Sequence, residues 1–271
     1  MLAKTKLLML VMVLTMFSNA VAQDSTQEKQ HVAKSNYDAL PPRQLIDCPT
    51  AATLPRASFD VHVRDFSGGG LLTSINIGLH QQFMIGVSYG GEGVLGESKA
   101  TWQDHPEFEV KYQFIPETYT FPAVALGFTS QGYGRYLKDW ERFTYKSKGF
   151  YAAVSKAYQT YEWATGFHGG INYSLEHTKD DDPNPDFFFG FDMNINHNVA
   201  IVAEYNVALN DNKKHEEKEF GGRGRGYFNI GLRWIFYERL ELGFDFKNLF
   251  DNRRDVNQVS RELRMSYYEF F

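Results

Sequence analysis

The stretch RELRMSYYEFF, from Arg261 to Phe271, ends the sequence and alternates between two kinds of side chain. Every second position counted back from the end is apolar or aromatic with one exception: Phe271, Glu269, Tyr267, Met265 and Leu263. The positions between them become polar towards Arg261. An alternating segment of about ten residues can cross a bilayer as a tilted β-strand. It can equally be the last strand of a soluble sheet, so the rest of the chain decides between the two.

The same alternation recurs from Ala57 onward and predicts about twelve strands. From the second connection on, short and long connections alternate. The predicted short connections are 80–82, 115–119, 157–160, 195–198 and 236–239, and the long ones are 91–105, 130–146, 176–186, 208–224 and 248–260. Short turns on one side, longer loops on the other and an even strand number are typical of outer-membrane barrels. We therefore expect an all-β fold, a transmembrane antiparallel up-and-down β-barrel over residues 56–271, with both termini in the periplasm.

Composition agrees with this fold class. Aromatic residues make up 16% of the chain, and such barrels carry aromatic girdles at both membrane interfaces. After residue 23 no run approaches the roughly 18 apolar residues that a membrane-spanning helix needs. One face of most predicted strands is aromatic or branched, and the other is rich in glycine and polar residues, which predicts a crowded, narrow lumen.

The N-terminal region predicts export. Lys4 and Lys6 precede an apolar run, and an Ala-Val-Ala site ends at Ala22, so residues 1–22 are expected to be a signal peptide. Its removal lowers the formal net charge of −5 by two, and this acidity argues against nucleic acid as a partner. Residues 23–55 are expected to form a polar, largely disordered periplasmic lead-in, with a plug inside the barrel as the alternative. Cys48, the only cysteine, is interpreted as a tolerated linker residue.

A set of charged residues falls on the predicted lumen face, and Arg233, Glu241, Asp245 and Arg264 are expected on neighbouring strands near the closing seam. The candidate site residues are Asp60, Arg64, Glu109, Lys111, Asp192, Glu204, Arg233, Glu241, Asp245, Lys247 and Arg264. They could form a charged constriction that selects solutes, or an ion-paired network that fills the barrel. The sequence leaves both interpretations open.

The sequence gives little support for an enzymatic function or a metal site. His168, His62 and His80 are available as bases, but no serine lies in a nucleophile motif such as G-x-S-x-G. His168 is interpreted as a hydrogen-bonded wall residue. The acidic run Asp180–Asp182 lacks the alternating ligands and glycine of a calcium loop. We therefore predict no catalytic residue, no metal and no cofactor.

Two resemblances follow from these residues. The final strand resembles the C-terminal signal strand of bacterial outer-membrane barrels, which implies recognition by the barrel assembly machinery through Met265, Tyr267 and Phe271. The stretches INIGLHQQFMIGVSYGG, PAVALGFTSQGYGRY and SKGFY, within residues 71–156, resemble the YjbH-like outer-membrane β-barrel proteins. That resemblance implies a role associated with exopolysaccharide and no catalytic residues.

Three functional hypotheses result. The first is an outer-membrane channel or export-associated barrel for small solutes or glycan. The second is a structural or surface-binding barrel with a closed lumen that acts through its loops Gly132–Tyr136 and 210–224. The third, and least favoured, is a hydrolase active at the barrel rim.

Overall fold

The computed structural model describes residues 41–271 apart from 97–98, 160–162, 213–220, 237–238 and 255–258. These residues belong to one compact unit, Val32–Phe271. The predicted signal peptide, the lead-in before residue 41 and the turn at 237–238 lie outside the described residues. Among the residues that are described, no helix has the length and apolarity to cross a bilayer.

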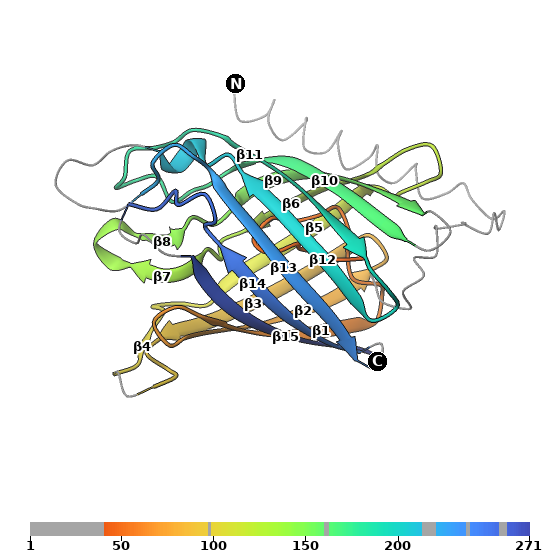
Figure 1. The fold of residues 1–271 in the computed structure, drawn as a ribbon, viewed down its shortest axis with the longest axis horizontal. Helices are drawn as coiled ribbons and strands as arrows, with labels where there is room; N and C mark the ends of the chain where they lie inside the picture. The colour runs from red at the N-terminus through yellow and green to blue at the C-terminus, as the bar shows by residue number, and fades with distance from the viewer. Residues whose placement is uncertain (1–40, 97–98, 160–162, 213–220, 237–238, 255–258) are drawn as a thin grey trace, which may run out of the picture. The chain divides into compact units, whose positions relative to one another are not determined.

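Twelve of the strands in the described ranges form one closed antiparallel barrel (Figure 1). Around the barrel they are β1 (Ser58–Phe66), β2 (Gly70–His80), β3 (Phe83–Glu92), β5 (Glu107–Ile115), β6 (Ala123–Thr129), β9 (Gly149–Gln159), β10 (Ala164–Tyr173), β11 (Asp186–Asn194), β12 (Val199–Asn206), β13 (Tyr227–Phe236), β14 (Leu240–Lys247) and β15 (Ser260–Phe270). The remaining elements are β4 (Thr101–Trp102), the hairpin strands β7 (Tyr133–Leu137) and β8 (Arg142–Tyr145), and the 3₁₀ turns η1 (Lys138–Trp140) and η2 (Leu209–Asp211). The predicted fold class and strand number are confirmed.

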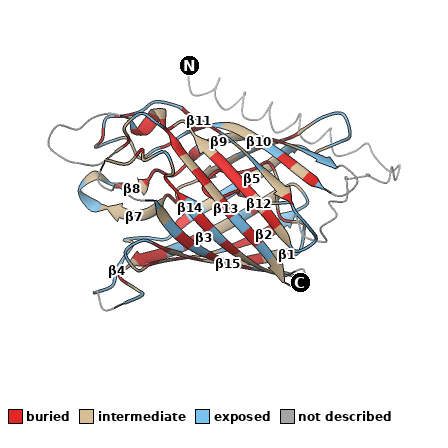
Figure 2. Cartoon of the chain, in the orientation of Figure 1, coloured by how far each residue is buried: buried red, intermediate tan, exposed pale blue. Residues whose placement is uncertain are grey.

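The alternation in the final stretch separates the two faces of the wall. On β15, Leu263 and Met265 are 50% and 44% exposed, whereas Glu262 and Arg264 between them are 4% and 7% exposed. Figure 2 shows the same banding of buried and exposed positions along the other strands. Large apolar side chains that point out of the barrel form the surface that a lipid-facing wall requires. Polar and charged side chains therefore point into the lumen.

The barrel closes between its first and last strands. β1 pairs with β15 in antiparallel register, with Asp60 opposite Tyr268 and Arg64 opposite Arg264. Beyond β15, the backbone N–H of Phe271 donates to the Ala57 carbonyl at 2.9 Å. The start of β1 and the end of β15 thus lie side by side, at the end of the barrel that carries the short turns.

Two predicted loops contain strands. The loop 91–105 includes β4, which pairs with the end of β3. The loop 130–146 folds into the β7–β8 hairpin, which has Gly134 (φ 74°) and Glu141 (φ 49°) in the left-handed region. Aromatic contacts explain this hairpin, because the rings of Tyr136 and Phe143 meet edge to face, 5.0 Å apart. The alternation in this stretch is too short to mark strands in advance.

The largest difference from expectation concerns residues 41–55, hereafter the lumen segment. Its apolar side chains Leu45, Ile46, Cys48, Ala51 and Leu54 are fully buried. A largely disordered lead-in is therefore wrong for this part of the chain, and the plug alternative describes it. The polar composition that indicated disorder suits a barrel lumen, because the wall there offers charged and polar partners.

Candidate functional site

The lumen segment is a tight hairpin. Leu45 N–H donates to the Cys48 carbonyl at 3.0 Å, and Thr50 N–H donates to the Arg43 carbonyl at 3.1 Å. Residues Leu45–Cys48 form the tip of this hairpin. After the tip the chain returns to the short-turn end, where the Thr53 hydroxyl donates to the Gln81 carbonyl. Because Gln44 and Pro49 form an antiparallel bridge, both described arms of the hairpin run from the tip towards the same end of the barrel.

Glu204 on β12 holds the tip from one side. Its carboxylate accepts the backbone N–H groups of Ile46, Asp47 and Cys48 at 2.8–3.0 Å, and the Asn229 side-chain amide at 2.8 Å. Successive N–H groups that converge on one anion form a backbone nest. Here the anion belongs to the wall and the nest belongs to the segment, so Glu204 fixes the conformation of the tip.

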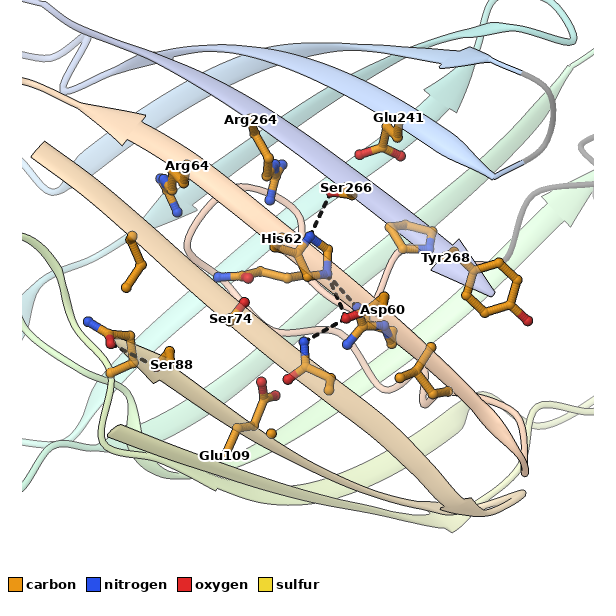
Figure 3. Close-up of a pocket in the computed structure, with 18 of the residues that line it drawn as sticks. Asp60, His62, Arg64, Ser74, Ser88, Glu109, Glu241, Arg264, Ser266 and Tyr268 are labelled. Carbon is orange, nitrogen blue, oxygen red and sulfur yellow. Dashed lines mark hydrogen bonds and ion pairs between the residues drawn. The ribbon is translucent and has the colours of Figure 1, made fainter. Parts of the chain in front are cut away.

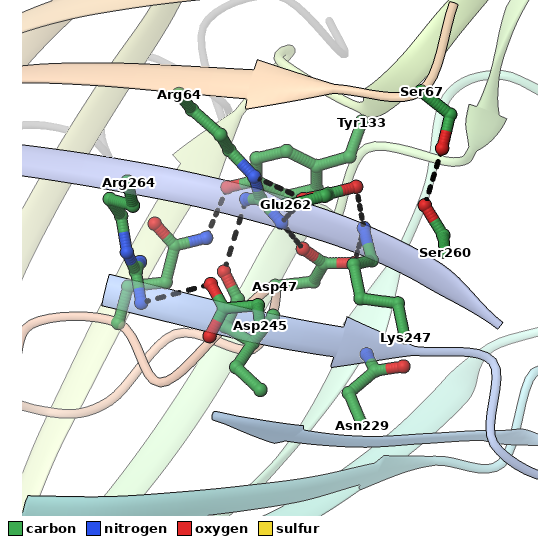
Figure 4. Close-up of polar contacts among 12 residues, drawn as sticks. Asp47, Arg64, Ser67, Tyr133, Asn229, Asp245, Lys247, Ser260, Glu262 and Arg264 are labelled. Atoms are coloured by element: carbon green, nitrogen blue, oxygen red, sulfur yellow. Dashed lines mark hydrogen bonds and ion pairs between the residues drawn. The ribbon is translucent and has the colours of Figure 1, made fainter. Parts of the chain in front are cut away.

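Beside the tip lies a group of six wall residues from β1, β13, β14 and β15, which we call the seam cluster: Arg64, Arg233, Asp245, Lys247, Glu262 and Arg264. Figure 4 labels all of them except Arg233. Each of them is less than 10% exposed. Their strands are adjacent at the seam of the barrel, and the alternation of each strand turns these six side chains inward.

The Asp47 side chain completes the charge pairing of this cluster. Its Oδ1 lies 2.6 Å from Arg64 Nη2, and its Oδ2 lies 2.6 Å from Lys247 Nζ. Glu262 is shared by the same two cations, 2.5 Å from Arg64 and 3.3 Å from Lys247. Two buried cations therefore face two buried carboxylates, one of which comes from the segment.

The remaining cations of the cluster bind the segment backbone. Arg233 and Arg264 both donate to the Leu45 carbonyl, at 2.8 and 2.7 Å, and Arg64 donates to the Ile46 carbonyl at 3.2 Å. Asp245 pairs with Arg233 at 2.6 Å and lies 3.7 Å from Arg264. The tip thus offers the wall three oxygen acceptors: a carboxylate and two carbonyl groups.

The rest of the segment binds other parts of the wall, on β5 and near the start of β1. Lys111 donates to the Arg43 carbonyl at 2.8 Å, and the Arg43 guanidinium forms an ion pair with Asp60 and contacts His62. Nearer the return to the short-turn end, the Gln113 side-chain amide donates to the Ala51 carbonyl.

A serine, a histidine and an aspartate form a line of hydrogen bonds across three adjacent strands, β9, β10 and β11. Ser155 Oγ is 2.8 Å from His168 Nδ1, and His168 Nε2 is 2.7 Å from Asp192 Oδ1. The Ser155 oxygen also accepts the N–H of Ala51 at 2.8 Å. This chain of hydrogen bonds therefore anchors the segment to the wall. His168 is a hydrogen-bonded residue of the wall, which is the role predicted for it from the sequence.

Glycine makes room for the segment at one place in the wall. A Cβ atom on Gly190 of β11 would lie 2.4 Å from Leu45 Cδ1 and 2.4 Å from the Ala203 carbonyl oxygen. A side chain at this position would displace the tip or the neighbouring strand. The inward glycines that predicted a crowded lumen thus accommodate a second layer of chain.

A cavity of about 180 Å³ lies beside the segment towards the short-turn end (Figure 3). Arg64 and Arg264 border it at its inner part, and Arg239 and Glu241 border it near the end of the barrel. The side chains of Arg239 and Glu241 retain 57% and 35% exposure. The cavity therefore connects the seam cluster with the short-turn end.

The opposite, long-loop end is covered by a cap. The ring of Tyr133 lies over the Arg64 guanidinium, with 4.3 Å between its centroid and Cζ, and its hydroxyl accepts from Gln44 of the segment. Behind it, Arg142 is 1% exposed and pairs with Asp180 at 2.8 Å and Asp211 at 2.7 Å. The β7–β8 hairpin is thus bound to two other loops through one buried guanidinium.

Charges in the cap are shifted by their surroundings. Burial by itself would lower the pKa of Arg142, but the carboxylates of Asp211 and Asp180 outweigh it and raise that pKa. Burial raises the pKa of Glu176 to about 7, although the N–H groups of Phe143 and Ser147 bind its carboxylate and oppose the shift. Glu176 therefore changes charge near neutral pH, at the base of the hairpin.

The structure brings part of the predicted site together. Of the four residues expected near the closing seam, Arg233, Asp245 and Arg264 meet in the seam cluster, where Arg64 and Lys247 of the wider candidate set join them. Glu241 lies at its edge, 3.6 Å from Arg233, and Glu204 faces the cluster across the tip. The other predicted residues, Asp60, Glu109, Lys111 and Asp192, lie on the wall of β1, β5 and β11 outside the cluster.

Sequence reasoning missed the partners that come from outside the barrel strands. Asp47 was not singled out, and Tyr133 was assigned to an outer loop. The only signal for Asp47 was its position beside Leu45-Ile46, the one apolar spot of the lead-in.

No family model matches the chain, and no curated protein matches it. Among solved structures it is similar to the KdgM porin (11% identity, TM-score 0.46, covering 79% of this chain and 99% of that one). It is also similar to Omp33 of Acinetobacter baumannii (9%, 0.45, 79% and 98%) and to the NanC porin (12%, 0.42, 79% and 99%). At such identities and TM-scores, the similarity assigns neither a substrate nor a functional residue to this chain.

Proposed function

We propose that this chain is an outer-membrane channel whose pathway is occupied by its own lumen segment. The observation that carries the proposal is that the charged wall is paired with a hairpin whose two described arms run towards one end of the barrel. A segment with this path can be withdrawn without unfolding the barrel. The wall that it leaves behind is lined by buried charges of both signs, as the wall of a water-filled pore is.

The width of the barrel supports a channel. Barrels of about eight strands are filled by their own side chains, and porins of 16–18 strands leave an aqueous channel. A barrel of twelve strands lies between these sizes. In this chain the space that wall side chains leave is filled by main chain, which can move as a unit.

The outer surface of the barrel supports a location in the outer membrane. Exposed apolar and aromatic side chains surround the wall, among them Phe167 at 53% and Phe189 at 51%, as a lipid environment requires. A closed barrel of this type, an export signal and a C-terminal aromatic strand support the bacterial outer membrane, with the short-turn end and both termini in the periplasm. Glycan, which the YjbH-like resemblance implies, and small solutes are the proposed cargo.

Single-channel conductance in a planar bilayer tests the proposal. The refolded mature chain is compared with a variant that lacks residues 42–54. We expect few and brief openings in the mature chain and steady open steps in the shortened one, because the deletion removes the hairpin from the lumen. Heat-modifiable mobility on a gel confirms that both are folded. If both folded proteins show no conductance, the proposed channel function is contradicted.

A second candidate is the closed, surface-binding barrel, which the cap favours. The buried Arg142 pairs and the Tyr133 ring cover the long-loop end independently of much of the segment. Silence of the shortened variant would support this candidate and move attention to the ligands of the cap.

We also propose that the barrel assembly machinery recognises the final strand. Phe271 is 80% exposed, and its ring lies 5.2 Å from that of Phe59 on β1. Deletion of Phe271 is expected to lower the amount of folded protein in the outer-membrane fraction, measured by heat-modifiable mobility. Phe271→Tyr keeps a ring at this position and is expected to insert normally. Normal insertion of the deletion variant would exclude Phe271 as a signal residue.

A further inference from the structure

We propose that the seam cluster is a binding site for the carboxylate group of an anionic solute, and that Asp47 occupies it as an intramolecular stand-in. This inference rests on the proposed channel function, because it assigns a solute class to the channel pathway. In the conformation described, the site is filled by the chain itself, so the contacts of Asp47 show how a carboxylate is held there.

The first argument is the geometry at the carboxylate. Arg64 and Lys247 come from different strands and approach different oxygens of Asp47, each at 2.6 Å. Arg64 is at the same time fixed by Glu262, which accepts from its Nε at 2.6 Å. A guanidinium held in place in this way is preorganised to bind a carboxylate, since little side-chain freedom is lost on binding.

The second argument is charge. Within the seam cluster, the four cations Arg64, Arg233, Lys247 and Arg264 exceed the two carboxylates of Asp245 and Glu262. Asp47 offsets part of this excess, and when the segment leaves, its charge leaves with it. Arg64 and Lys247 are then left to share Glu262 alone, and the positive excess of the cluster grows. The vacated cluster therefore favours a solute that brings a negative charge.

The third argument concerns the rest of the ligand. Arg233 and Arg264 bind the Leu45 carbonyl, so the site also accepts a neutral oxygen beside the carboxylate. On β12, the strand next to β13, Glu204 accepts three N–H groups and requires hydrogen-bond donors. A carboxylate flanked by an acceptor oxygen and by hydroxyl or amide donors fulfils both demands. Sugar acids and short acidic peptides share this chemistry.

The fourth argument is access. Arg64, Arg233 and Arg264 border the 180 Å³ cavity that reaches the short-turn end. Figure 3 shows Arg64 and Arg264 on its wall, with Glu241 and Tyr268 further along. A small anion can therefore reach the cluster while the hairpin is still in the lumen. It then competes with Asp47 for Arg64 and Lys247.

Cys48 reports this competition. It is the only cysteine of the sequence, it is fully buried, and it follows Asp47 directly. A maleimide reagent modifies it only when the tip leaves its place. We expect D-glucuronate to increase the rate of Cys48 labelling in the refolded full-length chain, and D-glucose at equal concentration to leave it unchanged.

Variants of the full chain locate the effect. Asp47→Asn removes the competing charge and is expected to lower the glucuronate concentration required for half of the effect. Adding Lys247→Gln to Asp47→Asn restores the net charge of the unaltered cluster and tip. It is expected to weaken glucuronate binding about tenfold or more relative to Asp47→Asn alone, because a charge-assisted contact is lost. Adding Lys247→Arg instead should restore most of it. Lys156→Gln, which removes a lysine outside the cluster, is the matched control.

Equilibrium dialysis with labelled glucuronate measures affinity independently of Cys48. N-acetyl-L-aspartate in place of glucuronate distinguishes an acidic peptide from a sugar acid as the better ligand. Equal glucuronate affinity with and without Lys247→Gln, or equal binding of glucose, would overturn the inference and leave the conductance test untouched. Conversely, if neither chain conducts but Lys247→Gln weakens glucuronate binding, the proposed channel function is contradicted and the anion-binding site is supported.

Discussion

Replacement of Glu204 by glutamine is expected to raise the rate of Cys48 labelling by a factor of about 100 or more. The Glu204 carboxylate accepts the N–H groups of Ile46, Asp47 and Cys48. Hydrogen bonds to a charged group contribute about 1.5–3 kcal/mol each, and about 1.4 kcal/mol corresponds to a factor of ten. With glutamine the three N–H groups lose a charged acceptor. An NH₂ group in place of Oε1 also faces two other donors, the Asp47 N–H and the Asn229 side-chain amide.

The matched control is Glu241→Gln. It makes the same change from carboxylate to amide on the lumen side, but Glu241 is 35% exposed and lies 3.6 Å from Arg233. Its labelling rate should stay close to that of the unaltered chain. If Glu204→Gln and Glu241→Gln react with maleimide at the same rate, the nest does not hold the tip in place.

Replacement of Arg142 by methionine should open the cap without unfolding the barrel. The substitution leaves the buried Asp211 without its cation, whereas Asp180 keeps Lys146 at 2.6 Å. Breaking one partner of a buried pair costs about 3–5 kcal/mol. The strand pairings of the barrel are not involved, so the loss is local. Hydrogen exchange should show the protection of backbone amides in β8 and η2 reduced by about two orders of magnitude or more, with the amides of β10 and β13 unaffected.

Arg135→Met is the control for the cap. Arg135 lies on the same hairpin, but it is 64% exposed in its pair with Glu92, and exposed ion pairs contribute little. Its substitution should leave exchange in β8 unchanged. Unaltered protection in Arg142→Met would show that the cap is held by other contacts.

The barrel itself could be predicted from the sequence because its signal is repeated. Each strand carries the same alternation, and the inward position of Arg233 and Asp245 follows from that period alone. Once β13 and β14 are neighbours, their side chains must meet. The register of the hairpins thus made half of the seam cluster predictable.

The rest of the site depends on contacts that have no local pattern. Asp47 lies in a polar stretch whose composition equally suits disorder in water, and only the charged lumen gives it partners. Tyr133 is assigned to a loop by its glycine neighbours, although its ring covers Arg64. Both residues reach the site by tertiary packing, which periodicity does not encode.

The seam cluster has a consequence for biogenesis. Arg64 and Glu262 are 198 positions apart, and Arg264 and Leu45 are 219 positions apart, so these contacts join the two extremes of the chain. Contacts of such long sequence separation form late, because a large loop must be closed first. Hairpin docking and ring closure therefore share the same side chains and stabilise each other as one cooperative step. A nascent barrel that has not yet joined its first strand to its last has no place to receive the hairpin.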